Sequence, residues 1–164
     1  DYTVSYGFSP VEGLDLEAGL IWYSFPEPEF DSTGEVYGSI TLSMVPYLSP
    51  SLTVYYDFDE VEGFYGTLGI GHTFELADCL SLSLGASVAY ADSAYNLAYF
   101  GVDDDGFNDG VLNASLDYAV GDNFSLSVYV SYSEMLDRDV KNAAEAGYGD
   151  SENVVVGLNA TFAF

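Results

Sequence analysis

The segment that most constrains the fold of this chain is its last one, because an apolar residue stands at every second position of 154–164 and, from Gly157 on, small or polar residues stand between them. Side chains of a β-strand point to opposite faces with a period of two. One face of this segment therefore carries Val154, Val156, Leu158, Ala160, Phe162 and Phe164. The other face carries Gly157, Asn159, Thr161 and Ala163. A β-barrel in lipid needs this pattern, with apolar side chains outside and polar ones inside.

The same alternation recurs along the chain and predicts further strands. We expect strands at 1–8, 14–23, 34–45, 51–58, 64–75, 80–91, 111–120, 124–134 and 154–164. Short turns follow the odd-numbered strands and long loops follow the even-numbered ones, which is the outer-membrane pattern of short periplasmic turns and long extracellular loops. We therefore predict a single domain over 1–164 that is all-β, an antiparallel up-and-down barrel of transmembrane type with about 8–10 strands.

Two aspects of this prediction leave alternatives open. A period of two does not say which face lies inside, so a soluble lipid-binding barrel with its apolar face inward is an alternative. The loop asymmetry and the aromatic carboxy-terminal residue favour the membrane. An odd number of strands is unusual, because bacterial single-chain barrels have even numbers. Either the first strand is an arm outside the wall, or further strands precede Asp1, or the first strand completes a neighbouring subunit.

The charge of the chain restricts its partners. It has 27 acidic residues and two basic ones, Arg138 and Lys141, which gives a formal net charge of −25. Nucleic acid is excluded as a partner, because its phosphates are bound by Lys and Arg. A surface of this charge attracts cations instead.

The second face of the predicted strands is rich in Ser, Thr, Gly, Ala and Tyr, and it also carries acids. These lumen-facing acids are Glu17, Glu35, Asp57, Glu75 and Asp117. No predicted strand contains Lys or Arg, and an unpaired buried charge is costly. One interpretation is a wet lumen, which indicates a passive pore that favours cations. The other is a narrow barrel filled by small residues and tyrosines, with its acids near the hydrated rims.

An acidic segment at 103–110 contains oxygen ligands of the kind that Ca²⁺ prefers. The candidate ligands are Asp103, Asp105, Asn108 and Asp109. The segment lacks the twelve-residue EF-hand pattern and its terminal Glu, so a solvated acidic loop is the alternative. We expect no other cofactor.

The only histidine, His72, lies in phase with Ile70 and Phe74 on the apolar face. Outer-membrane phospholipases carry a His and Ser pair on that face, but here Phe74 occupies the position of the serine. We interpret His72 as a residue at the membrane interface. Since the sequence also lacks a Cys–His cluster and a phosphate-binding loop, we predict that the chain is not an enzyme.

Several segments resemble a family of uncharacterised outer-membrane β-barrel proteins of Gram-negative bacteria. They are Trp22–Pro26, Thr33–Tyr37, Leu48–Asp59 and Gly71–Phe74. The closing strand is also similar to those of porin-like barrels, in which the terminal aromatic residues, here Phe162 and Phe164, resemble the signal read by the barrel-assembly machinery. The resemblance implies a location in the lipid of the outer membrane and supplies no activity.

These observations lead to two predictions of function. The first is an outer-membrane barrel with a structural or passive-pore role. The second is a barrel subunit at the cell surface that self-assembles into an extracellular fibre or array, through strand 1–8 or through its apolar face. A homo-oligomer is compatible with both predictions.

Overall fold

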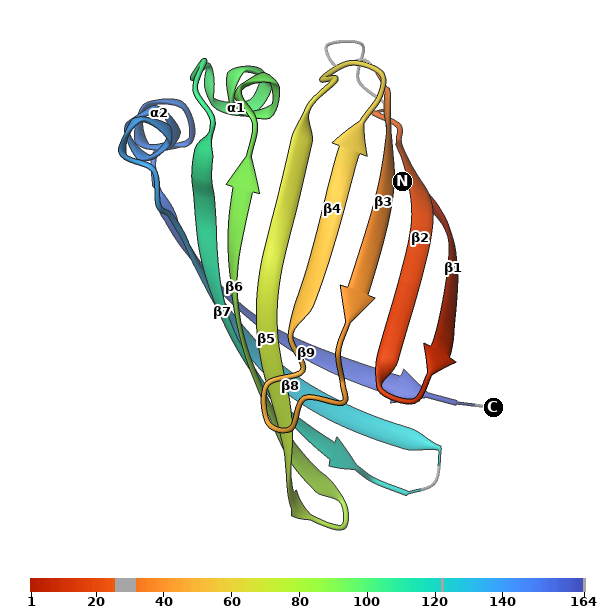
Figure 1. Cartoon of the computed structure of the whole chain (residues 1–164). Coiled ribbons are helices and arrows are strands. Elements are labelled where there is room, and N and C mark those ends of the chain that lie inside the picture. Colours follow the sequence, from red (N-terminus) through yellow and green to blue (C-terminus); the bar gives the residue numbers. More distant parts are fainter. Residues whose placement is uncertain (26–31, 122, 164) are drawn as a thin grey trace.

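The computed structural model describes residues 1–25, 32–121 and 123–163. They form one curved sheet in which antiparallel strands follow each other in chain order, from β1 to β9 (Figure 1). The strands are β1 Tyr2–Val11, β2 Leu14–Tyr23, β3 Thr33–Thr41, β4 Ser51–Asp57, β5 Phe64–Ala77, β6 Leu80–Ala91, β7 Gly106–Ala119, β8 Phe124–Met135 and β9 Glu152–Phe162. The helices are α1 Ser93–Phe100 and α2 Arg138–Tyr148. The predicted all-β, antiparallel up-and-down fold is confirmed.

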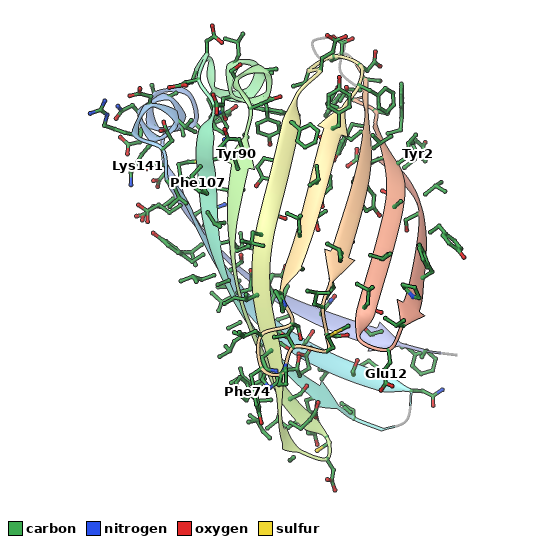
Figure 2. The ribbon with its side chains drawn as sticks, viewed as in Figure 1. Tyr2, Glu12, Phe74, Tyr90, Phe107 and Lys141 are labelled. Atoms are coloured by element: carbon green, nitrogen blue, oxygen red, sulfur yellow. The ribbon has the colours of Figure 1, made fainter. Side chains whose placement is uncertain are left out.

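The sheet is open, with β1 and β9 at its edges. Within the described residues, β1 pairs only with β2, and β9 pairs only with β8. Because β1 pairs with β2 from Tyr2 to Val11, it is part of the wall, and its interpretation as a separate arm is wrong. Tyr2 extends away from the sheet at this free edge and is 71% exposed (Figure 2). Nine successive antiparallel strands leave β1 and β9 running in the same direction.

Alternate residues along the strands form a polar face and an apolar face. The apolar face is exposed, since Leu68 of β5 and Leu112 of β7 are 57% and 59% exposed. On the polar face, Glu35 and Asp57 are buried. Helix α1 covers the polar face near β5, where its Tyr95 stacks on Tyr65. The residues that the structure describes therefore leave the apolar side chains, and not the polar ones, facing outward.

Aromatic side chains gather at both ends of the apolar face. The end near α1 carries Trp22, Phe58, Phe64, Tyr90 and Phe107, and the opposite end carries Phe74, Tyr118 and Phe162. Tyr90 and Phe107 lie on neighbouring strands and meet edge to face, with ring centroids 5.9 Å apart (Figure 2). Two such aromatic bands are typical of a barrel whose ends lie at the two interfaces of a membrane.

Both helices lie within segments predicted as loops, and both are at the same end of the sheet (Figure 1). Helix α1 is capped at its start by Asp92, whose carboxylate accepts a hydrogen bond from the Tyr95 backbone N–H at 2.9 Å, and at its end by Gly101 with φ of 72°. Helix α2 is likewise capped by Asp137 at its start and by Gly149, with φ of 90°, at its end. An acidic N-cap and a left-handed glycine satisfy the free backbone groups of helix ends. No helix in the described part of the chain is long and apolar enough to cross a membrane.

The largest departures from the predicted boundaries are in β3 and β7. The strand expected to reach Val45 ends at Thr41, because the backbone then turns, with the Val45 N–H donating to the Leu42 carbonyl at 3.1 Å. The resulting loop at 42–50 is longer than the loop at 58–63, so loop lengths do not alternate strictly. Strand β7 begins at Gly106, so part of the acidic segment is strand.

Candidate functional site: tyrosines and acids beneath α1

A row of tyrosines crosses the polar face from β3 to α1. Tyr37, Tyr55 and Tyr65 lie directly opposite one another on adjacent strands. Their ring centroids are 5.6 Å apart from Tyr37 to Tyr55 and 6.3 Å from Tyr55 to Tyr65. Tyr95 of α1 stacks on Tyr65 at 5.0 Å, and Tyr99 lies 4.5 Å from Tyr95. Cross-strand aromatic pairs stabilise a sheet, and here they also attach a helix to it.

Two carboxylates lie opposite each other on β3 and β4, beside this row. Glu35 is 8% exposed and Asp57 is 2% exposed. Asp57 uses both of its oxygens, since Oδ2 accepts the Thr33 hydroxyl at 2.7 Å and Oδ1 accepts two backbone N–H groups of the following loop at 2.9 and 3.1 Å. Glu35 accepts the Tyr23 hydroxyl through Oε2 at 2.9 Å. Asp57 therefore holds a loop, whereas Glu35 retains one oxygen without a hydrogen-bond partner among the described residues.

Buried amides connect α1 to β7. The Asn108 side-chain amide donates to Oδ1 of Asn96 at 2.5 Å, and the Asn96 amide donates to the Asp104 carbonyl at 2.9 Å. The Tyr65 hydroxyl donates to Oδ2 of Asp109 at 2.6 Å. Since Asn96 and Asn108 are both almost fully buried, these bonds fix the helix over the polar face.

The phenols on α1 stay protonated at neutral pH. Burial raises the pKa of Tyr95, and the neighbouring Tyr99 raises it further. Burial likewise raises the pKa of Tyr99, with the charge of Glu35 as the next cause. Both hydroxyls are therefore available as neutral hydrogen-bond donors.

A cavity of about 560 Å³ lies between α1 and the ends of β2 to β5. Its lining includes Tyr23, Glu35, Tyr55, Tyr65, Tyr95 and Tyr99. A second hollow of about 360 Å³ lies between α1, α2 and the ends of β7 to β9. A concave, mostly aromatic site with a few converging polar groups is the usual form of a small-molecule site.

Comparison with protein families matches residues 15–162 to the family described as MltA-interacting protein MipA. The chain belongs to the MipA family. The match extends from β2 to β9 and so includes the tyrosine row, Glu35 and both helices. This family is associated with the bacterial outer membrane, which agrees with the resemblance seen in the sequence. Comparison with curated proteins gave no match.

In this MipA-family chain, the five predicted lumen-facing acids share the polar face but do not form one site. Glu35 and Asp57 lie beneath α1. Glu17 accepts the Tyr37 hydroxyl, and Asp117 accepts the Ser115 hydroxyl at 2.5 Å. Glu75 is exposed near the turn between β5 and β6.

Hydroxyl groups, rather than basic residues, donate the side-chain hydrogen bonds to the acids of the polar face. The ion pairs of the described residues are both at α2, where Lys141 contacts Glu134 at 2.6 Å and Arg138 contacts Asp139 at 3.5 Å. The pairing with Glu134 raises the pKa of Lys141. Figure 2 shows Lys141 beside α2, on the opposite side of the view from β3, the strand that carries Glu35.

The four predicted calcium ligands have different surroundings. Asp103 is exposed, Asp105 accepts the Tyr90 hydroxyl, Asn108 contacts Asn96, and Asp109 accepts the Tyr65 hydroxyl. Among the described residues, no three side chains of His, Cys, Asp or Glu are close enough to hold a metal ion. Calcium binding stays a prediction of the sequence.

The loop at 42–50 forms a second ordered surface, at the end of the sheet opposite the helices. The Gly71 N–H donates to the Leu48 carbonyl at 2.7 Å, and the Tyr47 ring lies 5.0 Å from His72. His72 also contacts Phe74 edge to face at 4.5 Å, so it packs between two aromatic rings. Tyr47 remains 73% exposed and has φ of 64°. A non-glycine residue in this left-handed region is costly and needs surrounding contacts to hold it.

The predicted assembly signal is only partly described. Phe162 lies opposite Phe124 at the end of β9 and is 64% exposed. Phe164 lies outside the described residues.

The sequence prediction missed the site residues Tyr95 and Tyr99, because the segment after β6 was interpreted as a loop. Two signals were present. Asp92 and Gly101 are the cap residues of a short helix, and tyrosines four residues apart lie on the same helix face.

Proposed function

We propose that the chain spans the outer membrane and acts there as a structural protein that binds MltA, the partner named in the description of its family. The exposed apolar face and its two aromatic bands support a position in lipid. The end with α1 and α2 then lies outside the cell, and the end with the short turns lies in the periplasm.

The loop at 42–50 carries the proposed contact with MltA. It is held against β5 and next to the β1–β2 turn, where the Met44 N–H donates to the Gly13 carbonyl at 3.1 Å. Met44, Tyr47 and Leu48 are 52%, 73% and 48% exposed. A partner inside the outer membrane can reach this end of the sheet. Preformed, exposed aromatic and methionine side chains are the residues that most often anchor protein interfaces.

Binding of purified MltA to the full chain in detergent micelles tests this function. We expect saturable binding, and we expect Tyr47→Ala to weaken it about tenfold or more, as for an interface hot spot. Tyr148→Ala is the matched control, because Tyr148 is 69% exposed at the opposite end. A wild-type chain that does not bind MltA overturns the function, and equal losses in the two variants overturn the location.

A passive pore that favours cations is the second candidate, and the polar face supports it. That face carries acids, while the ion-paired basic residues of the described chain are both on α2. Conductance across a planar bilayer tests this candidate. We expect cations to pass in preference to anions. A preference for anions, or no conductance, rejects the pore.

The free edge of β1 supports the alternative of a fibre or array, since an unpaired strand is a template for pairing with another chain. Electron microscopy of material released without detergent separates this from a membrane protein. Ordered filaments or sheets support assembly through β1, whereas particles that are released only by detergent reject it.

A further inference from the structure

We propose that the cavity beneath α1 binds a small organic cation of the alkylammonium or quaternary ammonium class. This site is at the opposite end of the sheet from the loop at 42–50, so the proposal does not depend on MltA binding. Three properties of the cavity lead to it: its aromatic walls, a buried carboxylate with an unused oxygen, and the positions of the basic residues.

The walls of the cavity are largely aromatic. Tyr55 and Tyr65 come from the sheet, and Tyr95 and Tyr99 come from α1. The planes of successive rings are inclined by 50° from Tyr55 to Tyr65, by 29° from Tyr65 to Tyr95, and by 40° from Tyr95 to Tyr99. The face of an aromatic ring is negative, so a cage of rings attracts a cation, and a quaternary ammonium group is the usual ligand of such a cage.

Glu35 supplies a charge at the cavity. It is 8% exposed, and Tyr23 occupies only its Oε2 atom. Oε1 has no hydrogen-bond partner among the described residues, and Glu35 lines the cavity, so Oε1 is the oxygen that we assign to the ligand. Asp57, directly opposite, is not available, because its oxygens hold Thr33 and the following loop.

No basic side chain lines this cavity. The chain has two basic residues, Arg138 and Lys141, and both lie on α2 and are paired with Asp139 and Glu134. A carboxylate that is removed from water without a positive partner is unfavourable. A bound cation supplies that partner, and anions are repelled by a chain with a net charge of −25.

The donor set favours an organic cation over a metal ion. Ca²⁺ takes six to eight oxygen ligands, whereas the described lining of the cavity has one carboxylate, Glu35, and is otherwise mainly aromatic, with Ile21 and Thr33 beside the rings. The volume of about 560 Å³ is within the usual range of small-molecule sites. The phenol hydroxyls of the lining can donate hydrogen bonds to a hydroxyl or carbonyl oxygen of the ligand.

Isothermal titration of the full chain with choline chloride tests the proposal. The protein is kept in an uncharged maltoside detergent, and sodium chloride at the same concentration is the blank. We expect one saturable site per chain. The neutral isostere 3,3-dimethyl-1-butanol, in which carbon replaces the charged nitrogen, should bind at least tenfold more weakly. Equal binding of choline and the isostere shows an apolar pocket only and overturns the proposal, as does the absence of saturable binding.

Two variants place the site. Glu35→Gln should weaken choline binding about tenfold while it still accepts the Tyr23 hydroxyl. Glu17→Gln is the matched control, because Glu17 also accepts a tyrosine hydroxyl on the polar face but does not line the cavity. Tyr99→Leu removes one wall without changing any charge and should weaken binding severalfold. If Glu35→Gln and Glu17→Gln bind choline equally well, or if Tyr99→Leu binds as the wild type does, the proposed site is wrong.

Discussion

The ring of Tyr95 on α1 stacks on the ring of Tyr65 on β5, with centroids 5.0 Å apart and planes inclined by 29°. This stack joins a helix from the segment between β6 and β7 to the start of β5, the central strand of the sheet. It completes one wall of the cavity that contains Glu35. The position of α1 therefore decides whether the cavity exists.

Loss of this stack should loosen α1. We expect Tyr95→Leu to lower the free energy of unfolding by roughly 1 kcal/mol, the usual contribution of an aromatic pair beyond its buried area. Tyr95→Phe keeps the ring and should be close to the wild type. Denaturant unfolding in detergent micelles, followed by near-ultraviolet circular dichroism, measures both. Equal stability of the Leu and Phe variants contradicts a stabilising stack.

The phenol of Tyr95 also predicts a dependence of stability on pH. Its pKa in the folded chain is raised above the ordinary value of 10.0, mainly by burial. The fold then binds this proton more tightly than the unfolded chain, so the contribution is complete below pH 10 and is lost as the pH rises through the higher folded pKa. We expect the melting temperature of the wild type to fall more steeply above pH 10 than that of Tyr95→Phe. Parallel curves for the two proteins reject the prediction.

The strands could be predicted from the sequence, because each has one apolar side. The predicted bounds of β2 and β6 are those of the structure, since an apolar residue occupies every second position of both. The start of β7 was missed, because Asp and Gly, here Asp109 and Gly110, are residues that usually indicate a turn. Their strand conformation depends on contacts far along the chain, such as the bond from Tyr65 to Asp109.

The acids of the site could be placed on the polar face from the sequence, but their partners could not. Which hydroxyl reaches Glu35 depends on the register of β2 against β3, which places Tyr23 opposite Thr33. A one-residue shift in register would turn Tyr23 to the apolar face. Helix α1 was missed for a related reason, because a helix of eight residues is too short to be stable without its contacts with the sheet.

The buried pair of Asn96 and Asn108 gives a test of how α1 is attached to β7. Asn96→Ala leaves the Asn108 amide buried without its acceptor, which should cost about 1–3 kcal/mol. The double variant Asn96→Ala/Asn108→Ala removes both polar groups and should lose less than the sum of the single variants. Denaturant unfolding of the four proteins forms a double-mutant cycle. Additive losses would show that the two amides do not interact.

Gly13 is a test of how the loop at 42–50 is held. Its φ is 79°, and an added Cβ would lie 2.6 Å from the Cβ of Met44. We expect Gly13→Ala to lower stability by more than about 1 kcal/mol and to make the loop at 42–50 sensitive to protease. Gly149→Ala is the control, because Gly149 has φ of 90° but an added Cβ there meets nothing within 4 Å. Equal protease sensitivity in the two variants contradicts the role of the contact with Met44.

The orientation of the two faces can be tested at adjacent positions of β7. Leu112 is 59% exposed on the apolar face, and Asn113 is on the polar face, where it accepts the Ser131 hydroxyl at 2.8 Å. If the apolar face borders lipid, Leu112→Arg places a charge in hydrocarbon and should cost about 2–4 kcal/mol near the midplane. Asn113→Arg loses one hydrogen bond, but the charge of the new arginine lies on the polar side, so this variant should cost about 1 kcal/mol.

Urea unfolding of both variants in lipid vesicles measures this difference, and the same measurement in detergent micelles shows how much of it depends on the bilayer. We expect Leu112→Arg to be the more destabilised in vesicles. The reverse order, with Asn113→Arg the more destabilised, would mean that the polar face is the outer one, and the exposed leucines would then line the interior. That result would reject the position in the membrane together with the aromatic bands that support it.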